Sequence, residues 1–328
     1  MRDQNGKGVV TIAPPSPRRT ASGEEQLSRK GKVKQHLWDL ASRNGNAADP
    51  IGMIRAFMAD YSETGVSRPS LNCQVRPWAL GSLGGEWFIP ADADNSKRIL
   101  YVHGGAWIAG SIDTHRHLID AIAQAAGRPT LAIDYRLAPE DSFPAGLEDC
   151  AAALAWVIAH DPYGRASNGE VALIGDSAGG NLAAAATLDA LERNAPVPSS
   201  VVLLSPVLDA RPSSSPALGI DDPVGREGGS NSLLPLYRPD GGGADDFRIS
   251  PITAPDELLA RFPRTLIQAS SDEYLRDEAV AFARALWDQG RPVGLHIIAN
   301  MPHVFQLFTD ELPEARMAIH EIASFLAD

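Results

Sequence analysis

The sequence has only two cysteines among 328 residues, too few for a disulfide framework. No stretch approaches the roughly 20 consecutive apolar residues that a membrane-spanning helix needs. Basic residues are in the minority, 29 Lys and Arg against 41 Asp and Glu, which gives a net charge of −12. Nucleic acids and anionic membranes bind basic surfaces, so neither is expected as a partner. The first residues lack the apolar core of a secretory signal, and we expect a cytoplasmic protein.

The amino-terminal end differs in composition from the rest of the chain. Residues 1–35 carry eight Lys and Arg against three Asp and Glu, together with many Ser, Pro and Gly. This predicts a disordered or loosely attached basic arm, with a transit peptide as the weaker alternative. Apolar residues at helical spacing follow in two pieces, separated near residues 45–50, so residues 36–70 are expected to form cap helices.

Beyond residue 70, short apolar runs alternate with helical patterns. Six of the runs are nearly continuous in apolar residues, which is typical of parallel strands buried on both faces. Strands alternating with helices predict an α/β fold with a mostly parallel sheet, and two early strands without a helix between them predict an antiparallel start. The expected strands are 73–80, 85–89, 98–102, 130–135, 171–174, 201–205, 265–269 and 294–298, and the expected helices are 114–126, 145–160, 178–193, 275–289 and 311–326.

One long segment interrupts this alternation. Residues 210–250 are crowded with Gly, Pro, Ser and Asp, between two expected buried strands. Excursions of this length are usually functional, so we interpret about 207–250 as a cap or lid insertion within a catalytic domain of residues 71–328. A tolerated surface loop is the alternative.

The sequence Gly175-Asp176-Ser177-Ala178-Gly179 lies between an expected strand and an alanine-rich helix. This is the G-x-S-x-G pattern in the strand–turn–helix context of a nucleophile elbow. The turn holds the serine in a strained conformation, and the glycines leave room for neighbouring chain. A serine N-cap after a glycine turn is the simpler alternative. The context favours Ser177 as a nucleophile.

A second glycine turn, His103-Gly104-Gly105-Ala106-Trp107, ends an earlier strand. Acyl transfer requires fixed N–H donors for the oxyanion of the tetrahedral intermediate, and consecutive glycines let backbone amides approach it. An ordinary tight turn would explain the glycines alone, but not their pairing with a downstream elbow. We therefore expect this turn to contribute to an oxyanion hole.

In this architecture the acid and the base follow the nucleophile in the chain, in that order. Of the histidines after Ser177, His296 lies in a strand pattern and His320 in a helix, whereas His303 lies in the loop after the last strand. His303 is the expected base. Asp272 is the first carboxylate after the preceding strand and is the expected acid, with Glu273 as its close rival.

The remaining features do not indicate a metal or a nucleotide. His115 and His117 lie two residues apart at the start of an expected helix and so point in different directions, which does not suit a zinc site. Neither a G-x-G-x-x-G fingerprint nor a Walker A pattern occurs. We expect no metal and no cofactor.

Together these motifs resemble the hormone-sensitive-lipase-like branch of the α/β-hydrolases, over about residues 70–328. The resemblance also rests on the sequences at residues 134–140 and 143–145. It implies an eight-stranded mostly parallel sheet with a helical cap, and carboxylic ester hydrolysis. Carried over by position, it implies Ser177 as nucleophile, Asp272 as acid, His303 as base, and the amides of Gly105, Ala106 and Ala178 as the oxyanion hole. Ala106 replaces the usual third glycine, and its methyl group narrows the pocket.

The resulting hypothesis is a cofactor-free serine hydrolase that acts on small or medium acyl esters or lactones, with Trp107 beside a partly enclosed apolar pocket. A cyclase or acyl transferase using the same residues is the alternative, and a non-catalytic small-molecule receptor is the weaker one. The expected partner is a small-molecule ester or lactone substrate, and a homodimer is the assembly considered.

Overall fold

The computed structural model describes residues 10–12, 29–43, 50–63, 71–211, 220, 222, 234–239 and 243–328. Within them a single sheet has nine strands in the order β1-β9-β8-β7-β6-β4-β5-β3-β2. The strands are β1 (Val10–Ile12), β2 (Gln74–Leu80), β3 (Leu83–Ile89), β4 (Lys97–Val102), β5 (Thr130–Asp134), β6 (Glu170–Asp176), β7 (Ser200–Leu204), β8 (Arg264–Ser270) and β9 (Val293–Ile298).

The sheet is mostly parallel, as the sequence predicts. Strand β3 runs antiparallel to its neighbours β2 and β5, and the other pairs are parallel. All eight predicted strands are present. The ninth, β1, pairs in parallel with β9 at the sheet edge and lies within the segment that was expected to be a loose arm. The α/β-hydrolase prediction for the fold is confirmed.

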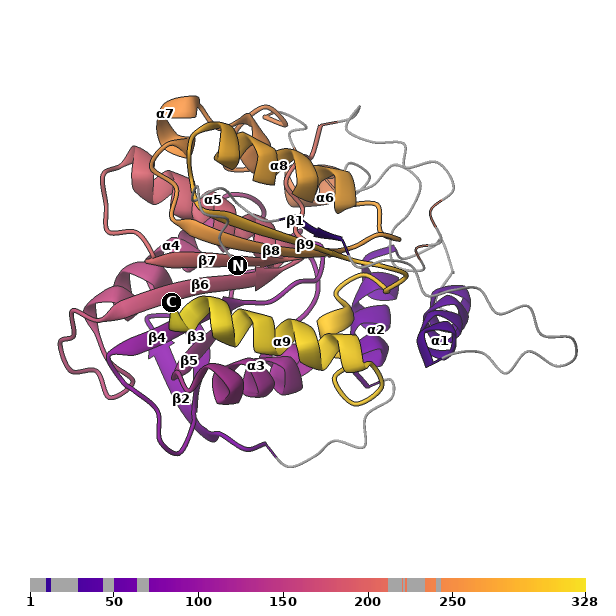
Figure 1. Ribbon diagram of the computed structural model, residues 1–328, viewed down its shortest axis with the longest axis horizontal. Coiled ribbons are helices and arrows are strands. Elements are labelled where there is room, and N and C mark those ends of the chain that lie inside the picture. The colour runs from indigo at the N-terminus through magenta and orange to yellow at the C-terminus, as the bar shows by residue number, and fades with distance from the viewer. Residues whose placement is uncertain are drawn as a thin grey trace, which may run out of the picture.

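Helices cover both faces of the sheet because its buried strands present apolar side chains to both sides. In β4, Ile99 and Tyr101 face one core cluster, and Leu100 and Val102 face the other. The period of two along the strand requires this alternation. Figure 1 shows the two layers, with α3 (Ile112–Ala126) and α9 (Pro313–Ala327) on one face, and α4 (Ala145–Ala159), α5 (Ala178–Glu192) and α8 (Arg276–Asp288) on the other.

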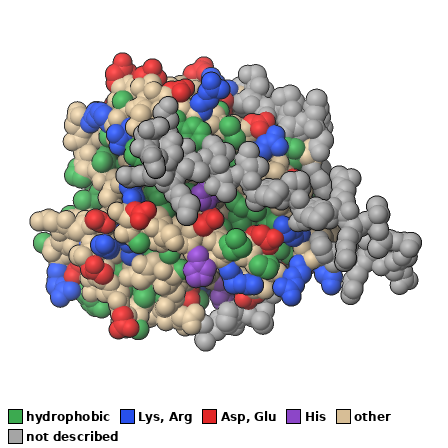
Figure 2. Space-filling view, viewed as in Figure 1, with side chains coloured by type: hydrophobic (Ala, Val, Ile, Leu, Met, Phe, Trp, Pro, Cys, Tyr) green, Lys and Arg blue, Asp and Glu red, His purple; other side chains and the backbone are tan. Residues whose placement is uncertain are grey.

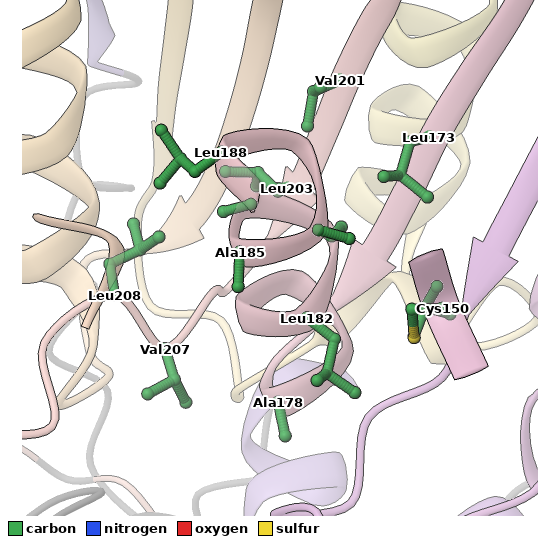
Figure 3. Close-up of a cluster of buried hydrophobic side chains, with 14 of the residues drawn as sticks. Cys150, Leu173, Ala178, Leu182, Ala185, Leu188, Val201, Leu203, Val207 and Leu208 are labelled. Carbon is green, nitrogen blue, oxygen red and sulfur yellow. The ribbon is translucent and has the colours of Figure 1, made fainter. Parts of the chain in front are cut away.

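Helix α5 is the central helix of its layer and follows directly after Ser177. Its side chains Leu182, Ala185 and Leu188 are buried, and they belong to the same core as Leu173 of β6 and Leu203 of β7 (Figure 3). Small alanine side chains let a helix approach a sheet closely, and a tightly packed interior has little room for movement. The start of α5 is therefore held rigidly against the ends of β6 and β7.

The first helix begins earlier than the predicted boundary at residue 36, while the role of this helical segment as a cap stays a prediction. Helix α1 covers Arg29–Arg43 and α2 covers Pro50–Glu63, so the last part of the expected arm 1–35 is helical. The apolar periodicity of α1 starts only at Val33, after a polar first turn that contains Gly31. For that reason its start was not recognised. Of the expected insertion, the structure describes residues 207–211, 220, 222, 234–239 and 243–250, which include the short helix α6 (Leu234–Tyr237), and the rest of this prediction lies outside the described residues. The 3-10 turn η2 (Pro251–Thr253) and the short helix α7 (Asp256–Leu259) follow the insertion.

On the face shown in Figure 2, acidic and basic side chains are interspersed. None of the helices in the described ranges has the length and apolarity needed to cross a membrane. The predicted absence of nucleic-acid partners and the predicted cytoplasmic location stay predictions.

Candidate active site

Ser177 lies at the turn between β6 and α5, with φ 53° and ψ −120°. This left-handed conformation is strained for a non-glycine residue and projects the side chain from the end of the sheet. A Cβ atom on Gly175 would lie 2.3 Å from the carbonyl oxygen of Gly179, and one on Gly179 would lie 2.1 Å from that of Val102. Both glycines are therefore sterically required, and the strand–turn–helix geometry predicted for the elbow is present.

His303 reaches Ser177 from a loop that is distant in the sequence. It lies in the loop between β9 and the 3-10 turn η3 (Phe305–Leu307), and its Nε2 is 3.0 Å from Ser177 Oγ. The amide of Val304 donates a hydrogen bond to Ser205 Oγ, after β7, and so fixes the loop. His296 instead lies 2.7 Å from Glu321, and His320 is exposed on α9. His303 is thus the histidine that the fold brings to the serine.

The acidic partner of His303 is Glu273, and Asp272 is wrong for this position. His303 Nδ1 lies 2.9 Å from Glu273 Oε2. The Glu273 side chain is fully buried, whereas the Asp272 side chain is 26% exposed and forms an ion pair with Lys34 of helix α1. Asp277, the next carboxylate along the chain, pairs with Arg276 in the first turn of α8.

The turn after β8 explains the exchange of these neighbouring carboxylates. β8 extends to Ser270, and the chain then reverses, so that the Ser270 amide donates a hydrogen bond to Glu273 Oε1 at 3.0 Å. This bond directs the Glu273 side chain back over the strand end. Asp272 lies on the outer side of the same turn, where Ser271 Oγ donates to its Oδ1. The register of a four-residue turn, rather than the order of acids in the chain, decides which carboxylate faces His303.

The glycine turn after β4 lies directly beside Ser177. A Cβ atom on Gly104 would lie 3.1 Å from Ser177 Cβ. Gly105, Ala106 and Trp107 have φ values of 128°, 57° and 62°, a run of left-handed backbone in which only the first residue is glycine. Such backbone curves the turn into a tight arc. The arc places the residues expected to form the oxyanion hole next to the nucleophile, although their role stays a prediction.

The profile of the alpha/beta hydrolase fold family matches residues 99–307, which include the glycine turn, the elbow, Glu273 and His303. The chain belongs to the α/β-hydrolase family. An acetyl-hydrolase of Streptomyces hygroscopicus is 34% identical to the hydrolase over 260 residues, which cover 75% of this chain and 80% of that protein. The carboxylesterase NlhH of Mycobacterium tuberculosis is 30% identical over 293 residues, which cover 87% and 92%.

Solved structures place the hydrolase in a branch of this family. An esterase described as a member of the bacterial hormone-sensitive lipase family superimposes with a TM-score of 0.78 at 32% identity, covering 90% of this chain and 97% of that one. The resemblance to hormone-sensitive-lipase-like α/β-hydrolases is confirmed. The hydrolase is an enzyme of the carboxylesterase type, a serine hydrolase.

The charge environment of His303 favours its protonated form. Burial alone would lower the pKa of the imidazole, but the hydrogen bond and negative charge of Glu273 outweigh burial. The carboxylates of Asp222 and Asp176 add to this effect, so the pKa of His303 is raised above its ordinary value. A base that is stabilised in its protonated form can receive the serine proton and hold it while an intermediate persists.

A buried ion pair between Asp176 and His115 lies next to the nucleophile elbow, and the sequence analysis did not find it. Asp176 accepts hydrogen bonds from Tyr101 Oη at 2.6 Å and from the Gly104 amide at 3.0 Å, and it lies 3.2 Å from His115 Nε2. The charge and hydrogen bond of Asp176 overcome burial and raise the pKa of His115. The residue before the nucleophile thus ties β6 to the glycine turn and to α3.

His115 shows what sequence could and could not reveal here. Its proximity to His117 raised a metal site for consideration, and the structure instead pairs it with Asp176. A histidine in the first turn of the helix that follows a glycine turn is a sequence signal that can indicate a buried ion pair beneath the nucleophile. However, its partner lies 61 residues away in the sequence. Only the packing of α3 against the sheet brings the two together.

Trp107, the expected substrate contact, is buried where the glycine turn packs against the insertion. Only 1% of its surface is exposed. Its ring stacks on Tyr237 of α6 with centroids 4.6 Å apart, and its Nε1 donates to Asn181 Oδ1. Asn181 in turn donates to the carbonyl oxygens of Val207 and Ile249, which flank the insertion. Trp107 therefore joins the glycine turn to the insertion, and its contact with substrate stays a prediction.

Proposed function

We propose that the hydrolase cleaves carboxylic esters through a triad of Ser177, His303 and Glu273. The observation that carries the proposal is the continuous line of contacts from Ser177 Oγ to His303 Nε2 at 3.0 Å and from His303 Nδ1 to Glu273 Oε2 at 2.9 Å. A nucleophile within hydrogen-bond reach of a base, which is itself oriented by a buried acid, is the arrangement required for acyl transfer to serine. Asp272, expected from sequence as the acid, has no part in this triad.

In the first half of the reaction, Ser177 Oγ attacks the ester carbonyl carbon while His303 Nε2 takes the hydroxyl proton. The carbonyl oxygen becomes an oxyanion, which the amides of Gly105, Ala106 and Ala178 stabilise, each donor contributing about 3 kcal/mol. The C–O bond to the alcohol then breaks, and His303 gives its proton to the leaving alkoxide. Glu273 holds the proton on Nδ1 and stabilises the imidazolium without accepting that proton.

In the second half, His303 deprotonates a water molecule that attacks the acyl-enzyme. The oxyanion forms again in the same place, and Ser177 leaves after regaining its proton from His303. The carboxylic acid is released and the enzyme returns to its starting state. Each proton removed is returned, so no cofactor takes part in the cycle.

The substrate class that fits best is a small or medium acyl ester, including lactones. Ala106 carries a methyl group at a position where the resemblance implies glycine, and this narrows the space beside the oxyanion. The rings of Trp107 and Tyr237 are stacked with their centroids 4.6 Å apart, which leaves no room for an acyl chain between them. A narrow acyl site excludes long or branched acyl groups by steric overlap.

The test is hydrolysis of p-nitrophenyl esters of increasing acyl length, from acetate to palmitate, by the full chain. We expect turnover to be greatest at short or medium chain lengths and to disappear in Ser177→Ala. Ser324→Ala is the matched control, since it removes a hydroxyl on the exposed part of α9. Labelling with a serine-reactive fluorophosphonate and peptide mapping should place the adduct on Ser177. Turnover that survives Ser177→Ala would exclude the triad, and product analysis with added alcohol separates hydrolysis from acyl transfer.

A further inference from the structure

Cap helix α1 touches both loops that meet at the site. Its buried residues Val33 and Leu37 belong to one apolar cluster with Met301 and Phe305, which lie two residues before and after His303. Next to Val33 in the same helix, Lys34 reaches the other loop, with its Nζ 2.7 Å from Asp272 Oδ2. The helix is thus held to the histidine loop by apolar packing and to the acid loop by charge.

Asp272 is part of a hydrogen-bond network that joins these two loops. Its amide donates to Ser270 Oγ at 2.9 Å, and Ser270 Oγ donates to the carbonyl oxygen of Met301 at 2.7 Å. Ser271 Oγ donates to Asp272 Oδ1 and accepts from the Asn300 amide. Asp272 is therefore linked through Ser270 and Ser271 to Met301 and Asn300, in the segment that leads into His303.

The Lys34–Asp272 pair is in a partly buried position. The side chains are 12% and 26% exposed, so solvent screens their attraction less than that of fully exposed ion pairs. Asp272 immediately precedes Glu273 in the turn after β8. Lys34 therefore contacts the outer side of this turn, and Glu273, the acid of the triad, lies on its inner side.

We propose that Lys34 is a positioning residue for the acid–base pair: through Asp272 it locks helix α1 onto the acid loop and so holds Glu273 and His303 in register. The proposal rests on the triad proposed above. It gives a role to the carboxylate that the sequence order favours as the catalytic acid. It also makes α1 part of the catalytic framework rather than a passive cover.

The pH profile distinguishes this positioning role from a merely structural one, because both members of the Lys34–Asp272 pair carry charge. His303 is faced by the carboxylates of Glu273, Asp222 and Asp176, and Asp272 is faced by Lys34 and, more distantly, by Arg276. Removing Lys34 takes away the cation that pairs with Asp272 and so makes the surroundings of the triad more negative, which favours the imidazolium of His303. Removing the charge of Asp272 leaves the positive charge of Lys34 in place, which disfavours the imidazolium of His303. The two variants should therefore shift the acidic limb of kcat/KM in opposite directions.

The experiment compares Lys34→Met, Asp272→Asn and the double variant with the wild type, using a short p-nitrophenyl ester across pH. We expect kcat to fall roughly three- to tenfold in each single variant, because the acid–base pair is less well positioned. The acidic limb should move up by about 0.3–1 pH unit in Lys34→Met and down by a similar amount in Asp272→Asn. In the double variant it should return close to its wild-type position.

Lys30→Met is the matched control, because Lys30 also anchors α1, but through Glu314 of α9 and the carbonyl oxygen of Ala299 rather than through Asp272. It should leave the acidic limb in place. The proposal is overturned if the two single variants keep the wild-type limb, or if Lys30→Met shifts it as Lys34→Met does. Fluorophosphonate labelling of wild-type Ser177 tests the triad separately. A wild type that neither hydrolyses nor becomes labelled refutes the proposed function, whereas a labelled enzyme with unmoved limbs refutes only the role of Lys34.

Discussion

Glu273 and His303 form a buried pair, with 2.9 Å between Oε2 and Nδ1 and no exposure of the glutamate side chain. We predict that Glu273→Gln lowers kcat by about 10³–10⁴-fold, since the amide cannot stabilise the imidazolium and can favour the wrong tautomer. Asp272→Asn should cost no more than about tenfold, because its carboxylate faces Lys34. Steady-state kinetics of both variants, after circular dichroism has shown that they are folded, makes the comparison. The reverse order of losses would restore Asp272 as the acid.

The pH profile of the wild type should reflect the raised pKa of His303. The base acts only when neutral, so kcat/KM should fall on the acidic side with a midpoint above the ordinary histidine value of about 6.5. Initial rates between pH 5 and 9 with a neutral ester check this. A midpoint clearly below 6.5 would mean that burial, rather than Glu273, controls the imidazole.

The elbow should tolerate no side chain at Gly179. A Cβ atom there would lie 2.1 Å from the carbonyl oxygen of Val102 and 2.4 Å from that of His103, both of which are backbone atoms. We expect Gly179→Ala to lower the free energy of unfolding by about 2–3 kcal/mol, despite the better helix propensity of alanine. Gly84→Ala is the control, since its added Cβ meets no atom within 4 Å. Urea unfolding should show the control to be unchanged or slightly stabilised.

Glu278 should make stability depend on pH near neutrality. Burial raises the pKa of its carboxyl to about 7, and the charges on Asp209 and Glu273 add to this shift. The hydrogen bonds donated by the Leu208 and Asp209 amides lower the pKa but do not outweigh burial. The folded protein therefore holds a proton that the unfolded chain loses near pH 4.3. The stabilisation is complete below that pH and is lost as the pH rises through about 7.

Glu278→Gln removes this titration. Between pH 5 and 7, the unfolding free energy of the wild type should decline relative to that of the variant, by up to about 1.4 kcal/mol per pH unit. Urea unfolding of both proteins at pH 5, 6 and 7 measures the difference. A constant difference across this range would show that Glu278 is ionised throughout.

Arg55 of α2 should support the glycine turn. Its Nε donates to the carbonyl oxygen of Ile108 at 2.8 Å, and its guanidinium also pairs with Glu140 at 2.6 Å. We expect Arg55→Met to lower kcat roughly three- to tenfold because the turn loses a fixed contact. Glu140→Gln should change kcat less than about twofold, because exposed ion pairs contribute little. Equal losses in the two variants would show that the ion pair, not the carbonyl contact, supports the turn.

The two carboxylates after β8 show where reading the sequence reached its limit. Both are acids at the end of a buried strand, and strand order alone restricts the acid to this turn. The choice between them depends on how far β8 continues and on the hydrogen bond between the Ser270 amide and Glu273. Neither the end of β8 nor this hydrogen bond produces a periodic pattern in the sequence. The same holds for His115 and Asp176, which only the packing of α3 brings together.

By itself, the sequence determined the sheet, the helical layers, the elbow at Ser177 and the loop that carries His303. These follow from local rules: apolar runs form buried strands, and glycines fit where a side chain would collide with neighbouring backbone. The tertiary structure decided which acid meets the histidine, which cation holds the other acid, and how the cap is attached. Those choices depend on distances between segments far apart in the chain, which local patterns do not encode.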